Sequence, residues 1–112
     1  MSVRAQVLLW TAQRVSAAVL GLCVVVHLAT MIYAVRHGLS ADEILARTRG
    51  NYAWFAFYSV FVAAVAIHAP IGVRAIVSET LGWRGGAVDF ALLALGLILA
   101  LEGWRAALAV FV

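Results

Sequence analysis

Three long apolar runs, over residues 15–35, 52–73 and 88–110, occupy most of this chain. A helix needs about 20 residues to cross about 30 Å of hydrocarbon, and each run is long enough to do so. The composition agrees, because 66% of the residues are hydrophobic and only 12% are charged, against about 25% charged in soluble proteins. We therefore predict an all-α integral membrane protein: a single membrane domain over residues 1–112, whose three spans form an up-down-up bundle.

The ends of the spans carry further signals. The first run is longer than the 7–15 residues of a typical signal-peptide core and no small-residue cleavage site closes it, so a cleaved signal peptide is not expected. In the second run Pro70 removes a backbone donor and frees the carbonyl four residues back, which predicts a kink. In the third run we expect Glu102 and Arg105 to pair across one helical turn near the far interface.

The connectors are short and contain no soluble domain. Between the first two spans Ser40 and Glu43 have the spacing of a capping box, and Ile44 and Leu45 provide an apolar side, which predicts a short helix along the membrane surface. A solvated connector is the simpler interpretation of the same residues. Residues 78–86, between the second and third spans, have the composition of a glycine-rich turn.

All eight basic residues are arginines, and with five acidic residues they give a net charge of +3. Most of these charges bracket the apolar runs, so they indicate membrane flanks and not nucleic-acid binding. The arginines divide evenly between the two sides of the membrane, Arg4, Arg14, Arg74 and Arg84 against Arg36, Arg47, Arg49 and Arg105. The positive-inside rule therefore gives no orientation. The single cysteine, Cys23, has no partner for an internal disulfide and is expected to pack as a small apolar residue.

His68 lies within the second apolar run, where an ionisable side chain is costly and usually marks an ion, proton or cofactor site. Imidazole is a standard axial ligand of haem iron. The alternative is a histidine hydrogen-bonded to a neighbouring helix. In an up-down-up bundle the start of the first span meets the end of the second, which predicts one site from Arg14, Ser16, His68, Gly72 and Arg74. There Gly72, one turn after His68, would let a flat macrocycle approach, and the two arginines suit carboxylates such as haem propionates.

His27 is a second histidine within the membrane. It lies about 20 Å of helix rise beyond Arg14, whereas His68 lies only about 9 Å from Arg74, so the two histidines sit at different depths and should not share one iron. Two interpretations remain for His27: it binds a second haem nearer the other surface, or it hydrogen-bonds a neighbouring helix. His37, in a polar connector, is expected to be solvated.

Two motifs then identify a resemblance to a family. The segment Gln13-Arg14-Val15-Ser16 resembles the His-Arg-x-Ser/Thr signature that opens the first membrane helix of the cytochrome b subunit of succinate dehydrogenases. The segment His68-x-x-x-Gly72-x-Arg74, followed by Glu79, resembles the signature on that family's second helix. Both the order and the three-span size agree, and the resemblance covers about residues 13–79.

The resemblance implies an anchor subunit of succinate:quinone oxidoreductase in a bacterial inner membrane. Its partners would be a second membrane anchor subunit, an iron–sulfur subunit and a flavoprotein subunit. It would hold haem b with His68 as the axial metal ligand. It would also shape a site for a quinone, either ubiquinone or menaquinone, from Arg14, Ser16, Thr11 and Trp10. By the same resemblance Gly72 and Arg74, and in two-haem relatives a histidine such as His27, belong to the cofactor-binding set.

Several positions depart from the family's signatures. Gln13 stands where histidine is usual, Ala17 replaces a glycine, Ala75 replaces a histidine and Glu79 replaces an aspartate. Trp10 stands at the position of a quinone-contacting serine, with Thr11 beside it as the nearest hydroxyl.

The function that follows is electron transfer to quinone as part of a larger oxidoreductase. Electrons from succinate would reach the quinone through the flavin and iron–sulfur clusters of other subunits, because this chain has no catalytic triad, paired carboxylate site, phosphate-binding loop or Cys-x-x-Cys pair of its own. One alternative is a haem-free membrane anchor or assembly subunit. Another is a small proton-conducting subunit in which His27 and His68 form a relay.

Overall fold

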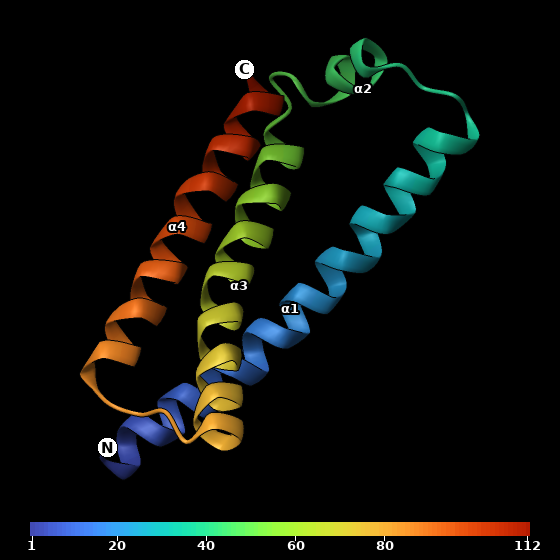
Figure 1. Cartoon of the computed structure of the whole chain (residues 1–112). Helices are drawn as coiled ribbons and strands as arrows, with labels where there is room; N and C mark the ends of the chain where they lie inside the picture. Colours follow the sequence, from blue (N-terminus) through green and yellow to red (C-terminus); the bar gives the residue numbers. More distant parts are fainter.

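The computed structural model describes residues 1–112 as four α-helices and one short π-helical turn, with no strand (Figure 1). The elements are α1 Val3–Arg36, α2 Ala41–Thr48, α3 Tyr52–Ile76, η1 Val77–Leu81 and α4 Gly86–Phe111. Three helices are long and apolar enough to cross a membrane: α1, α3 with its continuation to Leu81, and α4. The all-α, three-span prediction is therefore confirmed.

The helices extend beyond the predicted spans. Helix α1 begins at Val3 because the hydroxyl of Ser2 accepts a hydrogen bond from the backbone N–H of Ala5 at 3.2 Å, and nothing after it breaks the helix. Helix α3 continues through the π-helical turn until Gly82, whose φ of 69° is the left-handed conformation that ends helices. The turn predicted for residues 78–86 is therefore wrong in its first half, where the chain is still helical.

Helix α2 confirms the short helix predicted in the first connector. Its capping box is complete: the backbone N–H of Ser40 donates to Glu43 Oε2 at 2.6 Å, and the N–H of Glu43 donates to Ser40 Oγ at 3.3 Å. The backbone hydrogen bond that the Glu43 carboxylate accepts from Ser40, together with a smaller contribution from the Ser40 side chain, holds the pKa of this carboxyl below its ordinary value.

Helices α3 and α4 run antiparallel and pack through glycines. A Cβ atom on Gly103 would lie only 2.7 Å from Val62 Cγ1, so the backbones are in close contact there. A Cβ on Gly96 would lie 3.1 Å from Pro70 Cγ and 3.2 Å from the carbonyl oxygen of Ala66, the carbonyl that Pro70 leaves without its helical donor. In a membrane the hydrophobic effect does not drive helices together, so the close van der Waals packing that small residues allow takes its place.

Helix α1 crosses α3 near the loop between α3 and α4, then diverges from it towards α2 (Figure 1). Only five of the 112 residues are buried, among them Ser16 and Cys23 of α1. The chain therefore leaves most of its apolar side chains to be covered by lipid or by other subunits.

Candidate functional site

Ser16 and His68 meet where α1 crosses α3. Ser16 Oγ lies 3.5 Å from His68 Nδ1, and the Ser16 hydroxyl donates to the carbonyl oxygen of Gln13 at 3.1 Å. Because the hydroxyl has one hydrogen and donates it to Gln13, its oxygen is left to accept from the imidazole. In the tautomer that carries its proton on Nδ1, His68 donates to Ser16 and keeps the lone pair of Nε2 for a ligand.

Gly72 lies one turn beyond His68 and faces α1. A Cβ atom on Gly72 would meet Gln13 Nε2 at 3.2 Å. The Gln13 amide therefore occupies the space beside this glycine, where the sequence predicted that a flat macrocycle could approach. Gln13 Oε1 is itself buried without a hydrogen-bond partner.

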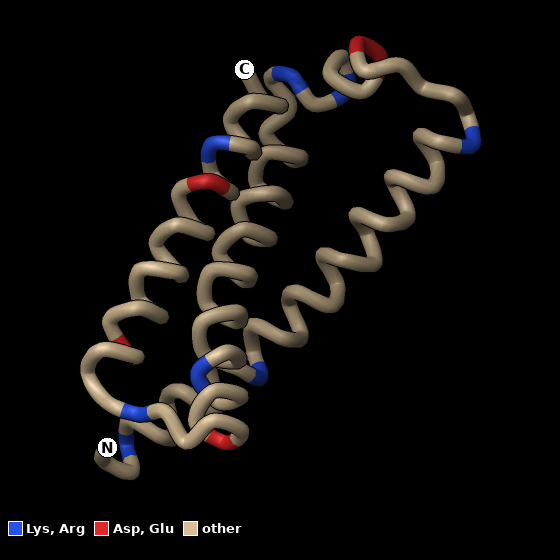
Figure 2. Tube along the Cα trace, in the orientation of Figure 1, with Lys and Arg blue, Asp and Glu red and all other residues tan.

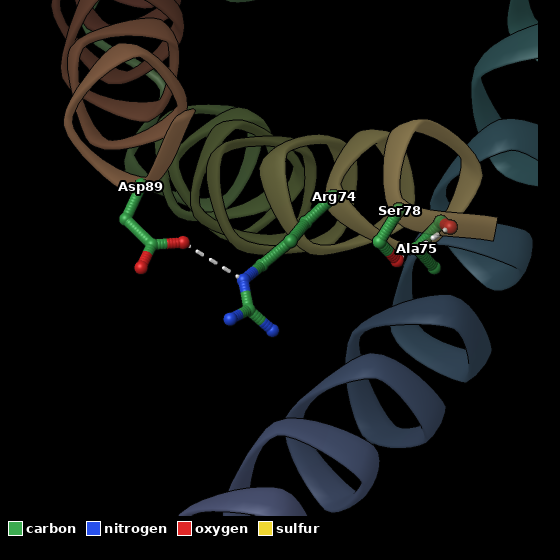
Figure 3. Close-up of polar contacts among 4 residues, drawn as sticks. All are labelled: Arg74, Ala75, Ser78 and Asp89. Atoms are coloured by element: carbon green, nitrogen blue, oxygen red, sulfur yellow. Dashed lines mark hydrogen bonds and ion pairs between the residues drawn. The ribbon is translucent and has the colours of Figure 1, made fainter. Parts of the chain in front are cut away.

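Arg74 pairs with a residue that the sequence analysis did not single out. Its Nε lies 3.0 Å from Asp89 Oδ1, which joins the last turns of α3 to the first turn of α4 (Figure 3). The two terminal guanidinium nitrogens have no hydrogen bond or ion pair within the chain and point away from α3 and α4 (Figure 3). Asp89 is the acidic residue in the first turn of α4, a local signal that marks it as a charged flank but does not identify its partner.

Trp10, Thr11 and Arg14 lie at the same end of the bundle as His68 but on another face of α1. Ser16 is two positions after Arg14, which turns the side chains about 200° apart on a helix of 3.6 residues per turn. Trp10 is one turn before Arg14, and the guanidinium carbon of Arg14 lies 5.6 Å from its ring centroid. All three residues are exposed. The structure thus divides the predicted set into Ser16 with His68 on the inner face and these three residues on the outer face.

The ring of His27 packs against two aromatic rings of α3 in edge-to-face geometry. The ring centroids of Tyr58 and Phe61 lie 5.8 Å and 5.7 Å from that of His27, both with nearly perpendicular planes. Its Nδ1 is buried and has no hydrogen-bond partner, so the predicted bond to a neighbouring helix is not made by this nitrogen. His37, expected to be solvated, is exposed but stacks on Tyr33 at 4.1 Å and lies 2.9 Å from that residue's carbonyl oxygen through Nδ1.

Two cavities open beside His27. One, of about 480 Å³, lies along α3 and α4 and includes Tyr58 and Glu102 in its lining. The other, of about 460 Å³, lies beneath α2 and includes Arg47 and Tyr58. No three His, Cys, Asp or Glu side chains gather as a metal-ligating group in the chain.

Comparison with known protein families matches residues 1–103 to one family, described as the succinate dehydrogenase/fumarate reductase transmembrane subunit. No curated protein and no solved structure gives a significant match. The match covers all three membrane helices, except the last turns of α4, and so includes both motifs that carried the resemblance. The chain belongs to the family of succinate dehydrogenase and fumarate reductase transmembrane subunits, and it is a multi-pass membrane protein.

Proposed function

We propose that this chain is a membrane anchor of succinate:quinone oxidoreductase that holds haem b through His68 and contributes to the quinone site. The observation that carries the proposal is the contact of Ser16 with His68 inside the bundle. In this arrangement a histidine within a membrane helix has one nitrogen oriented by a hydroxyl and the other left unused.

The residues present fit a haem ligand. A metal-bound histidine almost always donates its second ring N–H to a hydrogen-bond acceptor, which fixes the tautomer and the orientation of the ring. Ser16 occupies that role for His68 Nδ1, since its own hydrogen is bound to Gln13. When bound, a b-type haem supplies one-electron transfer at a potential tuned by its axial ligands and their surroundings. The opposing ligand would come from the second anchor subunit, because His27 lies at a different depth.

The arginines would serve at the edge of this site. Arg74 keeps two terminal nitrogens free while its Nε holds Asp89, so it can pair with a propionate and still join α3 to α4. Arg14, stacked on Trp10, presents its charge on the outer face of α1 beside Thr11. A quinone bound there would lie between this chain and the iron–sulfur subunit, with Thr11 as the hydroxyl donor, because Ser16 lies on the inner face and donates its hydrogen to Gln13.

The cofactor part of the proposal is tested by reduced-minus-oxidised optical spectra of the purified complex. His68→Ala should abolish the b-type band, whereas His37→Ala, which changes an exposed histidine outside the bundle, should retain it. Co-purification of the dehydrogenase subunits with both variants ensures that assembled particles are compared. A full b-type band in assembled His68→Ala complex would refute His68 as the ligand.

The quinone part is tested by the quinone reductase kinetics of Thr11→Val and Trp10→Ala. We expect the KM for quinone to rise in both, because the first loses a hydrogen-bond donor and the second an aromatic surface. Unchanged KM values in both variants would remove the outer face of α1 from the quinone site.

A further inference from the structure

Helix α4 differs from the other two spans in where its charges lie. Along α1 the uncharged stretch from Arg14 to Arg36 rises about 33 Å, which matches the thickness of the hydrocarbon core. Along α4 the stretch from Asp89 to Glu102 rises only about 20 Å. In Figure 2 most charges gather at the two ends of the bundle, but α4 carries an acidic and a basic segment well short of its C-terminal end.

The contacts with α3 set the level of this pair of charges along the bundle. Helix α4 is anchored to α3 at one end by Arg74 and Asp89, and at the other by the rings of Tyr52 and Phe111, whose centroids are 5.2 Å apart. Glu102 lies about 13 Å of helix rise before Phe111. The predicted ion pair is therefore present, and it lies between these two anchors.

The geometry of the pair keeps both charges at this depth. Arg105 Nη1 donates to Glu102 Oε1 at 3.0 Å. Side chains of a helix lean towards its N-terminus, so Arg105 extends towards the middle of the membrane instead of reaching for the headgroups. The side chains of Glu102 and Arg105 are 59% and 68% exposed on this chain. Charged groups exposed at such depth face protein or a water-filled cavity, and not lipid.

Two exposed faces of α4 have opposite character, about 120° apart around the helix. The first, here called the large apolar face, consists of Phe90, Leu93, Leu97, Leu101 and Trp104. The second, here called the polar face, consists of Ile98, Glu102, Arg105, Ala106 and Ala109. Large apolar residues are typical of a surface in contact with lipid, and small and polar residues are typical of helix–helix interfaces in membranes.

The polar face borders the cavity of about 480 Å³ along α3, which also includes His27 and Tyr58 in its lining. Helix α1 contributes only His27 to this cavity, and the side chains of Glu102 and Arg105 remain 59% and 68% exposed. The guanidinium of Arg105 uses one of its five N–H groups and the Glu102 carboxylate one of its oxygens, so unmet hydrogen-bonding groups remain at this depth.

We propose that the polar face of α4 receives a transmembrane helix of the second anchor subunit, with a hydrogen-bonding side chain opposite Glu102 and Arg105. The inference rests on the proposed function, which requires a second anchor, and adds where that anchor docks. The large apolar face of the same helix remains in contact with lipid.

The test places photoreactive benzoylphenylalanine at Ile98, on the polar face, and as a matched control at Leu97, on the large apolar face. These residues are 58% and 63% exposed, so the two probes start from similar accessibility on this chain. After illumination of the assembled complex in its membrane, Ile98 should give a severalfold higher yield of adduct with the second anchor than Leu97. Adducts at Ile98 with lipid alone, or with a second copy of this chain, would overturn the assignment.

A double substitution gives an independent measurement. Glu102→Leu with Arg105→Leu removes both charges and keeps the helix apolar, which would favour a surface exposed to lipid. We expect it to lower the yield of second anchor recovered with this chain severalfold, because the docking helix loses its polar contacts; unchanged recovery would contradict the proposal. Dehydrogenase subunits that fail to co-purify with the unaltered chain would refute the proposed function instead, so the two failures are distinguishable.

Discussion

Gly103→Ala tests the closest helix contact in the bundle. The added methyl group would lie 2.7 Å and 2.8 Å from the two γ-carbons of Val62 and 3.3 Å from its Cβ. Such short contacts are not tolerated, so either Val62 rotates or α4 moves away from α3. A β-branched side chain in a helix has one strongly preferred rotamer, which makes rotation costly.

The magnitude follows from two opposing contributions. Inserting a methyl group into a packed interface costs about 1–3 kcal/mol. Replacing glycine by alanine within a helix returns about 0.5–1 kcal/mol. Because the steric cost exceeds the helical gain, we expect Gly103→Ala to lower the free energy of unfolding by about 1–2 kcal/mol.

The assay is equilibrium unfolding of the purified protein in mixed micelles, followed by circular dichroism. Gly21→Ala is the matched control, because a Cβ there meets nothing within 4 Å and only the helical gain of about 0.5–1 kcal/mol remains. Adding Val62→Ala to Gly103→Ala removes both γ-carbons and should relieve most of the steric cost of the added methyl group. The double variant should therefore lose less free energy of unfolding than the sum of the two single variants, and this difference is their coupling energy. Equal effects of Gly103→Ala and Gly21→Ala would refute the close approach of α3 and α4.

Three further predictions concern polar contacts. Asp89→Asn should cost no more than about 1 kcal/mol, because its pair with Arg74 is partly exposed, and the loss should shrink further in high salt when unfolding is measured at two ionic strengths. Hydrogen bonds with Ser40 lower the pKa of Glu43 in the folded chain. The stability that this cap contributes is therefore fully present above the unfolded-state pKa, and it is lost as the pH falls through the lower folded-state pKa. An NMR titration should give a lower midpoint for Glu43 in the unaltered chain than in Ser40→Ala. Ser16→Ala, which leaves the imidazole without its acceptor, should lower the free energy of unfolding by about 1 kcal/mol, while Ser16→Thr, which keeps the hydroxyl, should lose less.

Much of the candidate site was predictable because helical parity is a simple rule. An up-down-up order brings the start of the first span to the end of the second, and Ser16 does meet His68 there. The partners of Gly72 and Arg74 were not predictable in this way. Spacing along a helix gives the face on which a side chain lies, but not which side chain of another helix it meets. Gln13 reaches Gly72, and Asp89 reaches Arg74, through contacts that join separate helices.

The membrane environment, the number of spans and the short capped helix between the first two spans all follow from local sequence. A long apolar segment has few stable states in hydrocarbon, since every backbone hydrogen bond must be made within it, and a capping box acts only over neighbouring residues. The level of Glu102 along α3 and the pairing of Arg74 with Asp89 emerge only in the folded chain. Those features depend on the register and rotation of whole helices, which are set where Gly96 and Gly103 let α4 approach α3, and such contacts between distant segments leave no periodic pattern in the sequence.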